Sequence, residues 1–322
     1  MKNEKSNVRF LHLLDHIGGT ISNLISPLGS YPEHQILTSS FDLKKTMNLI
    51  KEISKNEDIS VILHSTGNKK PFYNKKEDIF KRFKKSYMFL HVSPIHFLIK
   101  DRLKEIENIE KLVNKDNFEI LTPSKGIKKE LSYYGINSKV MQLGVIFRPE
   151  EYKLDKKEDK KYIITVCTSG EGIYHYIKGV DRFYRIVKEL GLENQSIVLG
   201  NGSALFKDIK SKKLTPKNFI KYLCKSKAYV QFSRTESYNL SAVYAKLLKV
   251  PIVVSNIEGH IDNVKYGFRT NNMLESKKVL ENILQNPNDP QIKKIINKNY
   301  KDSIKRENLN NFKNSFNQLV NL

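Results

Sequence analysis

The stretch AYVQFSRTESYNLSAVYAKLLKVPIVVS, residues 228–255, decides the fold class of this chain. It opens with an apolar run, Ala228–Phe232, passes through a polar turn into a segment of helical periodicity, and closes with a second apolar run, Ile252–Ser255. Continuous apolar runs are typical of parallel strands buried on both faces, and a helix is the usual connection between two such strands. The stretch therefore predicts a β-α-β unit whose polar turn follows the first strand.

The same alternation extends over most of the chain and predicts an α/β protein. Seven further apolar runs are expected to be strands: Val8–Leu14, Ile59–His64, Tyr87–His91, Glu119–Thr122, Lys139–Leu143, Tyr162–Cys167 and Ser196–Leu199. Helical patterns cover Phe97–Val113, Ser124–Tyr134 and Val180–Leu190, and the spacing of Phe312, Phe316 and Leu319 predicts a closing helix.

One charged segment without apolar periodicity, Arg148–Lys161 (RPEEYKLDKKEDKK), divides the pattern into two halves. We interpret it as an interdomain linker. The expected organisation is an N-terminal domain over 1–147, the linker over 148–161, a C-terminal domain over 162–300 and the closing helix within 301–322. A cleft between the two domains is then the default binding site.

The charge of this 322-residue chain is strongly positive, at +22 from 56 basic and 34 acidic residues. Only nine of the basic residues are Arg, the residue on which nucleic-acid readers depend for bidentate contacts. Compositional drift explains a Lys-rich excess best, an anionic membrane or substrate comes second, and nucleic acid is the weakest candidate.

Two cysteines, Cys167 and Cys224, exclude a disulfide framework and a Cys-based zinc cluster. The start of the chain, MKNEKSNVRF, has no apolar signal core, and no apolar run reaches the roughly 18 residues of a membrane span. We therefore expect a cytoplasmic protein, peripheral at most at the inner face of the membrane.

Four strand-to-helix turns carry the residues that could bind a ligand, because ligands collect at the carboxyl edge of parallel sheets. They are Asp15–Thr20 with its paired glycines, Thr168–Asp181 with Lys178 before Gly179, Ser233–Lys246 with Glu236, and Asn256–Val264. Each has an ordinary structural explanation as well: a simple glycine turn, a solvated lysine, or the hydroxyl and acidic residues that favour a helix start.

Sequence patterns for metal or nucleophilic chemistry are lacking. The chain contains no Asp-x-Asp, no H-E-x-x-H and no G-x-S-x-G, and His12 and His16, four apart, fall on an expected strand and turn. We therefore expect no metal and no cofactor.

Five motifs in the right order resemble the family 4 retaining glycosyltransferases with the two-Rossmann-domain GT-B fold. The resemblance is carried by Lys178-Gly179-Val180 (K-G), Val230–Ala245 (the E-x7-E-A donor motif), Lys249–Ser255, Ile257–Val264, and Thr122-Pro123-Ser124 with Leu131–Val145. It implies two Rossmann-like domains facing across a cleft, with a C-terminal helix that returns to the N-terminal domain.

The resemblance also implies an activity: transfer of a sugar from a nucleotide-sugar donor to an envelope glycan, glycolipid or protein acceptor, with retention and without metal. The catalytic residues would be Glu236, holding sugar hydroxyls, Lys178, facing the diphosphate, and His91, similar to the cleft histidine of the family. The donor-binding residues would be Gly18, Gly19, Ser169, Lys178, Ser233, Glu236, Tyr238, Asn239, Leu240, Ser241 and Tyr244, with Leu240 and Ser241 offering backbone amides to the phosphates.

Two departures from the family pattern keep alternatives open. The second Glu of E-x7-E falls on Tyr244, and the Arg that usually precedes the K-G lysine is missing, with Thr168-Ser169-Gly170 near its place. A non-catalytic subunit of another glycosyltransferase is one alternative, and a sugar-nucleotide epimerase with the same two-domain fold is another.

The stretch Lys69–Tyr87 (KKPFYNKKEDIFKRFKKSY) combines a high density of basic residues with interleaved aromatics. This pattern is typical of interfacial segments and predicts a surface for an anionic acceptor or membrane. The alternative is a solvated basic helix whose Phe80 and Phe83 belong to the core.

Overall fold

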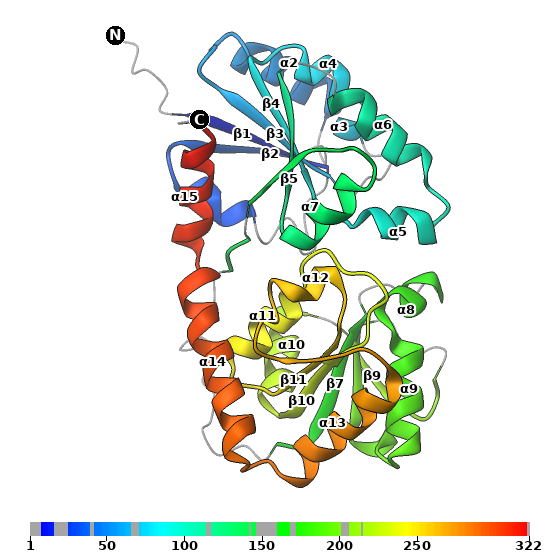
Figure 1. Cartoon of the computed structure of the whole chain (residues 1–322). Coiled ribbons are helices and arrows are strands. Elements are labelled where there is room, and N and C mark those ends of the chain that lie inside the picture. Colours follow the sequence, from blue (N-terminus) through cyan, green and yellow to red (C-terminus); the bar gives the residue numbers. More distant parts are fainter. Residues whose placement is uncertain are drawn as a thin grey trace. The chain divides into compact units, whose positions relative to one another are not determined.

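The computed structural model describes residues 8–15, 25–38, 42–65, 71–113, 117–141, 143–145, 160–167, 172–200, 206–213 and 215–320. The chain forms two compact units (Figure 1). The first contains Met1–Ile146 together with Leu309–Leu322, and the second contains Phe147–Asn308. Most of the expected linker, residues 148–159, lies outside the described residues.

The first unit is built on a parallel six-stranded sheet of order β2-β1-β3-β4-β5-β6. Its strands are β1 (Phe10–Leu14), β2 (His34–Thr38), β3 (Ser60–Ser65), β4 (Lys85–Leu90), β5 (Phe118–Thr122) and β6 (Ser138–Val140). The side chains of a strand alternate between the two faces of its sheet. Leu11 and Leu13 accordingly enter one apolar cluster, whereas Phe10 and His12 lie against Phe316 on the opposite face.

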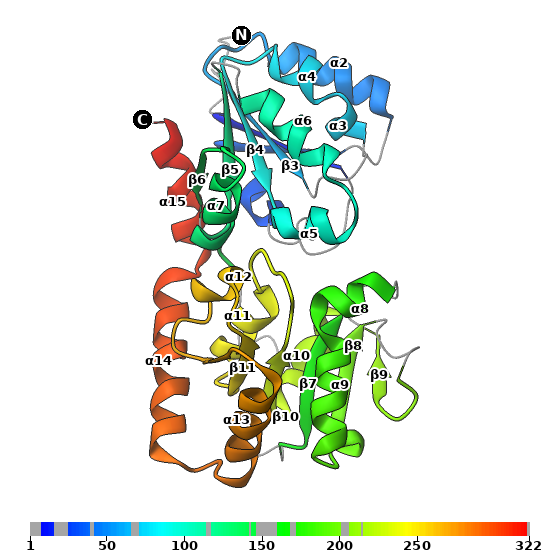
Figure 2. The same ribbon diagram turned by 45° about the vertical axis from the view of Figure 1, so that its right-hand side comes forward.

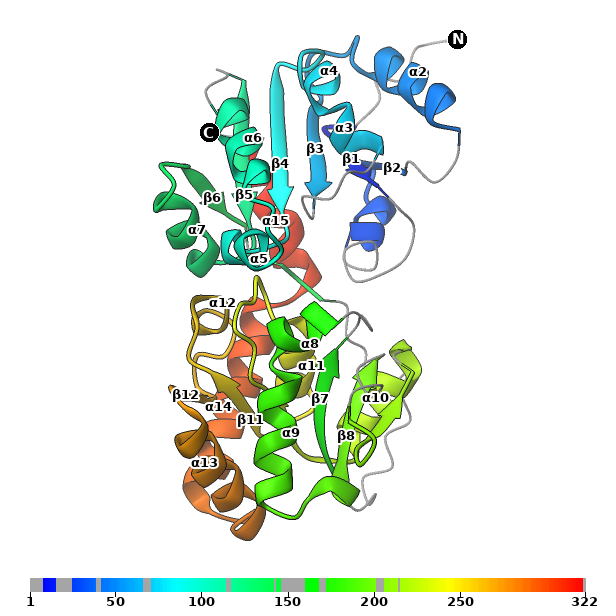
Figure 3. The same ribbon diagram turned by 90° about the vertical axis from the view of Figure 1, so that its right-hand side faces the viewer.

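Helices cover both faces of this sheet. The Leu11 face packs against helices that connect successive strands: α2 (Leu43–Ile53), α3 (Pro71–Asn74), α4 (Lys76–Phe80), α5 (Pro94–Ile99), α6 (Lys104–Val113) and α7 (Lys125–Ser132). Of these, α5 and α7 pack together beyond the ends of β4 and β5 (Figure 3). The His12 face is covered by the C-terminal helix α15 (Leu309–Val320), drawn in red in Figure 1. The closing helix therefore belongs to the N-terminal unit, as expected.

The second unit contains a parallel sheet of order β12-β11-β10-β7-β8-β9. Its strands are β7 (Tyr162–Cys167), β8 (Ser196–Gly200), β9 (Lys210–Lys212), β10 (Ser226–Gln231), β11 (Ile252–Ser255) and β12 (Phe268–Thr270). With the strands renumbered within the unit, this is the 3-2-1-4-5-6 order of a dinucleotide-binding sheet. The order reverses between the neighbours β7 and β10.

Helices flank the second sheet (Figure 2), and two separate apolar clusters lie on its two faces. On one face α9 (Val180–Glu189) and α13 (Met273–Gln285) pack with Val230 and Val253. On the other, α10 (Pro216–Cys224) and α11 (Leu240–Leu247) pack with Tyr229 and Ile252. The remaining helices are α8 (Gly172–Lys178), α12 (Glu258–Ile261) and α14 (Pro290–Arg306).

All nine expected strands are present, but the sequence pattern missed three edge or near-edge strands. These are β2 (HQILT), β9 (KSK) and β12 (FRT), which are short or polar and so lack a continuous apolar run. The single helix expected over Phe97–Val113 is two helices. Asp101 adopts φ 53°, and the amide of Arg102 donates to the carbonyl of Phe97 at 2.8 Å, which ends α5 in a Schellman-type turn.

The basic stretch 71–87 does not present its aromatics to an interface. Phe72, Tyr73, Phe80 and Phe83 are all buried in the core of the first unit. The exposed side chains are polar or charged: Lys75, Lys81, Arg82, Lys84 and Lys85, together with Asn74, Glu77 and Asp78. The expectation of an aromatic interfacial segment is therefore wrong, and the surface left to this stretch is purely electrostatic.

Candidate active site

The second sheet brings Lys178 and Glu236 together at the point where its strand order reverses. Lys178 ends α8, which follows β7, and Glu236 lies in the segment after the neighbouring strand β10. The Nζ atom of Lys178 lies 2.5 Å from Oε2 of Glu236. A crevice at such a reversal, outside the carboxyl ends of the strands, is where open α/β sheets bind ligands. The structure therefore brings Lys178, from the turn after β7, next to Glu236, from the turn after β10.

The ion pair is buried on the Glu236 side. The Glu236 side chain is 8% exposed and that of Lys178 is 24% exposed. Burial by itself would raise the pKa of Glu236, but the Lys178 ammonium and its hydrogen bond hold that pKa below its ordinary value. Glu236 is thus an ionised acceptor near neutral pH, suited to sugar hydroxyls.

A second ion pair clamps the loop that carries Glu236. The guanidinium of Arg234 makes two hydrogen bonds to the Asp181 carboxylate, at 2.8 and 2.6 Å. The Arg234 guanidinium also lies 3.7 Å from the centroid of the Tyr176 ring, and its backbone amide donates to the carbonyl of Ile177 at 2.8 Å. Bidentate pairs fix orientation as well as distance. The clamp therefore holds the Glu236 loop against the end of α8.

Two glycines let neighbouring segments approach this loop closely. A Cβ atom at Gly179 would lie 1.9 Å from the carbonyl oxygen of Phe232, and one at Gly259 would lie 1.7 Å from the carbonyl oxygen of Glu236. Gly179 also adopts φ 66°, a conformation that residues with a side chain rarely adopt. Both glycines belong to motifs noted in the sequence. The structure explains why a residue without a side chain is needed there: each lies against the backbone of the segment 232–236.

A hydrogen-bonded network supports the start of α11. The Nδ1–H group of His260 donates to the carbonyl of Ser255 at 2.8 Å, so Nε2 accepts from the Asn239 amide at 3.1 Å. Oδ1 of Asn239 in turn accepts from the backbone amide of Ala242 and from the Tyr229 hydroxyl, both at 3.0 Å. Burial lowers the pKa of His260 to about 4, so the ring is neutral. Asn239 therefore caps α11, and its side chain is already occupied.

Several predicted donor ligands have other roles. The Tyr238 hydroxyl donates to Glu307 at 2.7 Å, and the Leu240 amide donates to the Tyr238 carbonyl at 2.8 Å. The Leu240 amide, predicted to face a phosphate, thus already has a backbone acceptor. The ring of Tyr244 stands edge-on to Phe219, with ring centroids 5.7 Å apart. The side chains of Tyr238 and Tyr244 therefore contribute to the packing around the site.

Two predicted residues each keep a polar group that the described residues do not use, the Ser233 hydroxyl and the Ser241 backbone amide, whereas the Ser241 hydroxyl bonds Tyr229. Ser233 is fully buried, and its hydroxyl has no hydrogen-bond partner among the residues that the structure describes. Ser241 stands in the first turn of α11, where amides have no intrahelical acceptor. Gly18, Gly19 and Ser169 lie outside the described residues.

His91 belongs to the first unit, one residue beyond β4, and it is buried by stacking on Phe89 with ring centroids 4.4 Å apart. Burial lowers the pKa of His91 to about 3, so its ring is neutral near pH 7.

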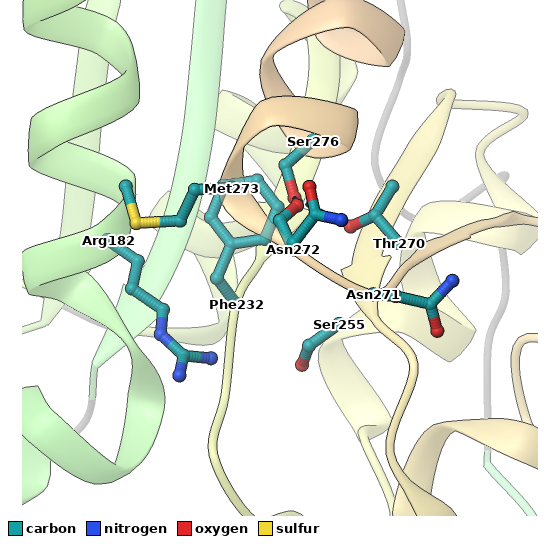
Figure 4. A pocket seen from close by; sticks show the side chains of 8 residues that line it. All are labelled: Arg182, Phe232, Ser255, Thr270, Asn271, Asn272, Met273 and Ser276. Atoms are coloured by element: carbon teal, nitrogen blue, oxygen red, sulfur yellow. Dashed lines mark hydrogen bonds between the residues drawn. The ribbon is translucent and has the colours of Figure 1, made fainter.

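A cavity of about 280 Å³ opens in the second unit, beside the loop that carries Glu236 and between α9 and α13 (Figure 4). Its walls are Arg182, Phe232, Ser255, Thr270, Asn271, Asn272, Met273 and Ser276. Sequence reasoning missed it because its residues come from five separate elements. Figure 4 shows Arg182 and Met273 on one side and Asn271 on the other. The volume is at the small end of ligand pockets.

Within the described part of the chain, no group of three or more His, Cys, Asp or Glu side chains could hold a metal ion. Among the same residues, no helix combines the length and the apolar character needed to cross a bilayer.

The strand orders, flanking helices and two-unit organisation are those of the GT-B fold, and solved structures share it. HepE of Anabaena, solved with UDP and glucose, has a TM-score of 0.69 at 14% identity, covering 98% of this chain and all of HepE. Sucrose-phosphate synthase of Thermosynechococcus elongatus has a TM-score of 0.71 at 11% identity, covering 97% of this chain and 98% of that protein.

TarM of S. aureus, solved with fondaparinux, α-GlcNAc-glycerol and UDP, has a TM-score of 0.62 at 17% identity. The match covers 87% of this chain, which spans only 58% of the length of TarM. No family model and no curated protein sequence matches this chain. The similarity to these proteins is therefore one of fold.

Proposed function

We propose that this protein is a glycosyltransferase that moves a sugar from a nucleotide-sugar donor to a glycan, glycolipid or protein acceptor, with retention and without a metal ion. The observation that carries the proposal is the Lys178–Glu236 pair at the strand-order reversal of the second sheet. The similar folds of HepE, solved with UDP and glucose, and of trehalose-6-phosphate synthase, described as acting with retention, support it. A UDP-sugar is accordingly the first donor to test.

The chemistry asks for two things that this pair can supply. The bond between the sugar and the diphosphate breaks, and the leaving diphosphate gains negative charge. The ammonium of Lys178 and the amides of the first turn of α11, Ser241 included, would offset that charge. The ionised Glu236 would accept hydrogen bonds from sugar hydroxyls and hold the ring in place. The buried Ser233 hydroxyl offers a further partner.

The test begins with ligand binding. A thermal-shift panel of UDP-, GDP-, ADP- and CMP-sugars identifies the donor, because a ligand that binds the folded state raises the melting temperature. Donor hydrolysis and transfer assays on Lys178→Ala and Glu236→Gln follow. We expect each variant to stay folded and to lose at least about tenfold in rate, since losing one such stabilising group costs roughly 2–4 kcal/mol.

Matched controls come from the exposed pair of Lys139 and Glu119, whose charged atoms lie 2.8 Å apart. Lys139→Ala and Glu119→Gln should leave turnover unchanged. Wild-type rates in both site variants, with a confirmed donor, would show that the site is misassigned.

A non-catalytic subunit is the second candidate, and the packing of Tyr244 favours it. Where the resembling enzymes carry a glutamate, this chain has a ring packed on Phe219 and no carboxylate. Co-purification of an active glycosyltransferase, with no turnover by this chain alone, would support that role.

Peripheral contact with an anionic membrane is proposed for the exposed basic residues at 75–85. Because the aromatics of this stretch are buried, the attraction would be electrostatic and salt-sensitive. Co-sedimentation with anionic vesicles at low and high salt, with Lys81, Arg82 and Lys85 each changed to Ser, tests it. Equal pelleting of the wild-type protein and the triple variant would argue against this surface.

A further inference from the structure

Four of the eight histidines of this chain form one hydrogen-bonded row inside the first unit. Nδ1 of His34 lies 2.9 Å from Nε2 of His12, Nδ1 of His12 lies 3.0 Å from Nε2 of His64, and Nδ1 of His64 lies 3.0 Å from Nε2 of His91. The same pair of atoms is used at every link. We refer to these four residues as the histidine row.

The parallel register of the sheet builds the histidine row. His34 pairs with Phe10 on β1, and His12 stands two residues further along that strand. His64 pairs with Leu14, again two residues beyond His12, and His91 stands two residues beyond Phe89, the partner of His64. Steps of two keep every ring on one face. The row therefore runs diagonally across β2, β1 and β3 to the carboxyl end of β4.

Aromatic rings pack against the histidine row and keep it largely buried. Phe316 of α15 lies 5.0 Å from the His12 ring and 5.4 Å from the His34 ring, measured between centroids. Phe89 stacks on both His64 and His91. None of the four histidines is more than 9% exposed. Burial lowers the pKa of all four, so the row is neutral near pH 7.

Neutral imidazoles in such a row have only two joint arrangements. Each ring carries one N–H donor and one acceptor nitrogen. If His91 donates from Nε2, then His64 and His12 must also donate from Nε2, because any other choice sets two donors or two acceptors against each other. If His34 donates from Nδ1, all the rings must carry Nδ1–H. The tautomer at one end therefore fixes the tautomer at the other.

The two ends of the histidine row differ. Nδ1 of His91 makes no hydrogen bond with the described residues, and it lies at the carboxyl edge of the sheet, where ligands of such sheets collect. At the other end, Nε2 of His34 is buried without a partner among the described residues. The charged groups that act on His34 are the carboxylate of Glu33 and the ammonium of Lys313, which form an ion pair.

We propose that the histidine row is a proton relay that sets the protonation of His91 Nδ1 at the carboxyl edge of the first sheet. His64, His12 and His34 are then positioning residues, since they act through His91. Its use for activating an acceptor hydroxyl rests on the proposed glycosyl transfer, whereas the relay itself does not.

The step balances as a transfer of one proton. With all four rings in the Nε2–H form, His91 Nδ1 takes a proton from a hydroxyl group. The Nε2 proton of His91 passes to His64 Nδ1, that of His64 to His12, and that of His12 to His34. His34 releases its own Nε2 proton to a water molecule that must enter at the edge strand β2, beside the partly exposed ion pair of Glu33 and Lys313. All rings end in the Nδ1–H form, and the reverse transfer resets them.

Ring tautomers can be measured without any activity assay. Long-range proton–nitrogen NMR of the full chain with 15N-labelled histidine should show the four rings neutral at pH 7 and in one common tautomer. His12→Phe interrupts the row, so we expect averaged tautomers at His91. His12→Gln keeps a donor and an acceptor and should preserve a single His91 tautomer. The matched control His96→Gln, in the same unit but outside the row, should change none of the four signals.

Opposed tautomers in the wild type, a protonated ring at pH 7, or an unchanged His91 spectrum in His12→Phe would overturn the relay. If His12→Phe does not fold, the wild-type spectrum and His12→Gln still decide.

Kinetics separate the relay from a purely structural role once a donor is known. Gln can hold the hydrogen bonds but cannot tautomerise, so His12→Gln should lower kcat about tenfold and alter its pH profile while the donor KM stays unchanged. A wild-type kcat and pH profile in His12→Gln would overturn the relay and leave glycosyl transfer standing. If no donor is turned over by the wild type, the proposed function fails, and the NMR result still decides the relay.

Discussion

The ammonium of Lys246 and the carboxylate of Glu307 lie 2.7 Å apart, and neither side chain is exposed to solvent. The hydroxyls of Tyr238 and Ser303 also donate to Glu307, at 2.7 and 2.5 Å. The cluster joins α11, whose first turn belongs to the candidate active site, to the C-terminal end of α14. The position of α11 thus depends on a charge pair that water does not reach.

Removing one member of this pair should be costly. Lys246→Met leaves the Glu307 carboxylate buried without its cation, and we expect a loss of about 3–5 kcal/mol in the free energy of unfolding. The double variant Lys246→Met/Glu307→Leu should recover part of that loss, because no charge is then left uncompensated. Urea unfolding measures both. The exposed pair member Lys139→Met is the control and should change stability by less than about 1 kcal/mol.

Two of the glycines with positive φ, Gly179 and Gly135, should respond differently to alanine. They have similar φ values, 66° and 69°, so both pay about 1 kcal/mol for a Cβ in that conformation. Only Gly179 would also set its Cβ 1.9 Å from a carbonyl oxygen, whereas Gly135 has nothing within 4 Å. We expect Gly179→Ala to lower the melting temperature clearly more than Gly135→Ala. Equal shifts in a thermal melt would contradict the close approach.

Acidification should destabilise the protein through the histidine row. Burial lowers the pKa of His34 to about 4 and that of His91 to about 3. Below about pH 6.5 these histidines bind protons in the unfolded chain but stay neutral in the folded chain. The free energy of unfolding is therefore unaffected by them above that pH and decreases as the pH falls toward 4. For His34 alone the loss amounts to about 3 kcal/mol by pH 4.

The measurement is a series of urea midpoints from pH 7.5 to pH 4.5, compared with the same series for His12→Gln. Each buried neutral histidine contributes a slope of at most about 1.4 kcal/mol per pH unit. The variant should therefore show a shallower dependence than the wild type. Parallel curves for the two proteins would mean that His12 does not resist protonation.

Chelation should leave the transferase rate unchanged. The diphosphate would be held by Lys178 and backbone amides, and no Asp-x-Asp pair stands in the sequence to hold a divalent ion against it. We expect rates in excess EDTA and in magnesium to agree within about twofold, as for any site whose charge stabilisation comes from fixed groups. A rate abolished by EDTA and restored by manganese would refute the metal-free mechanism.

The central strands and the pairing of Lys178 with Glu236 could be predicted from the sequence for a physical reason. Buried parallel strands are continuous apolar runs, and the ends of neighbouring strands meet at one edge. The residues that hold the pair were harder to find. Arg234 and Asp181 are separated by 53 positions and carry no motif that announces a clamp. The partners of Tyr238 and Asn239 likewise come from tertiary packing, which local patterns do not encode.

The histidine row was invisible in the sequence for a related reason. His34 sits on β2, an edge strand that has no apolar run, so the strand itself was missed. Without the pairing register of β2 against β1, a separation of 22 positions does not indicate that His12 and His34 are in contact. The buried aromatics of 71–83 were misread because charge density describes the surface of a helix and not the face that it buries.

The helix α15 has a consequence for the synthesis of the protein. Phe316 of α15 covers Phe10, His12 and His34. Because α15 begins more than 160 residues after β6 ends, it is synthesised only after the whole second unit. Domains otherwise fold in order as they emerge. A nascent N-terminal unit must therefore wait with one apolar face of its sheet uncovered, which makes that face a natural substrate for chaperones. A premature stop codon before Leu309 would leave it open for the life of the molecule.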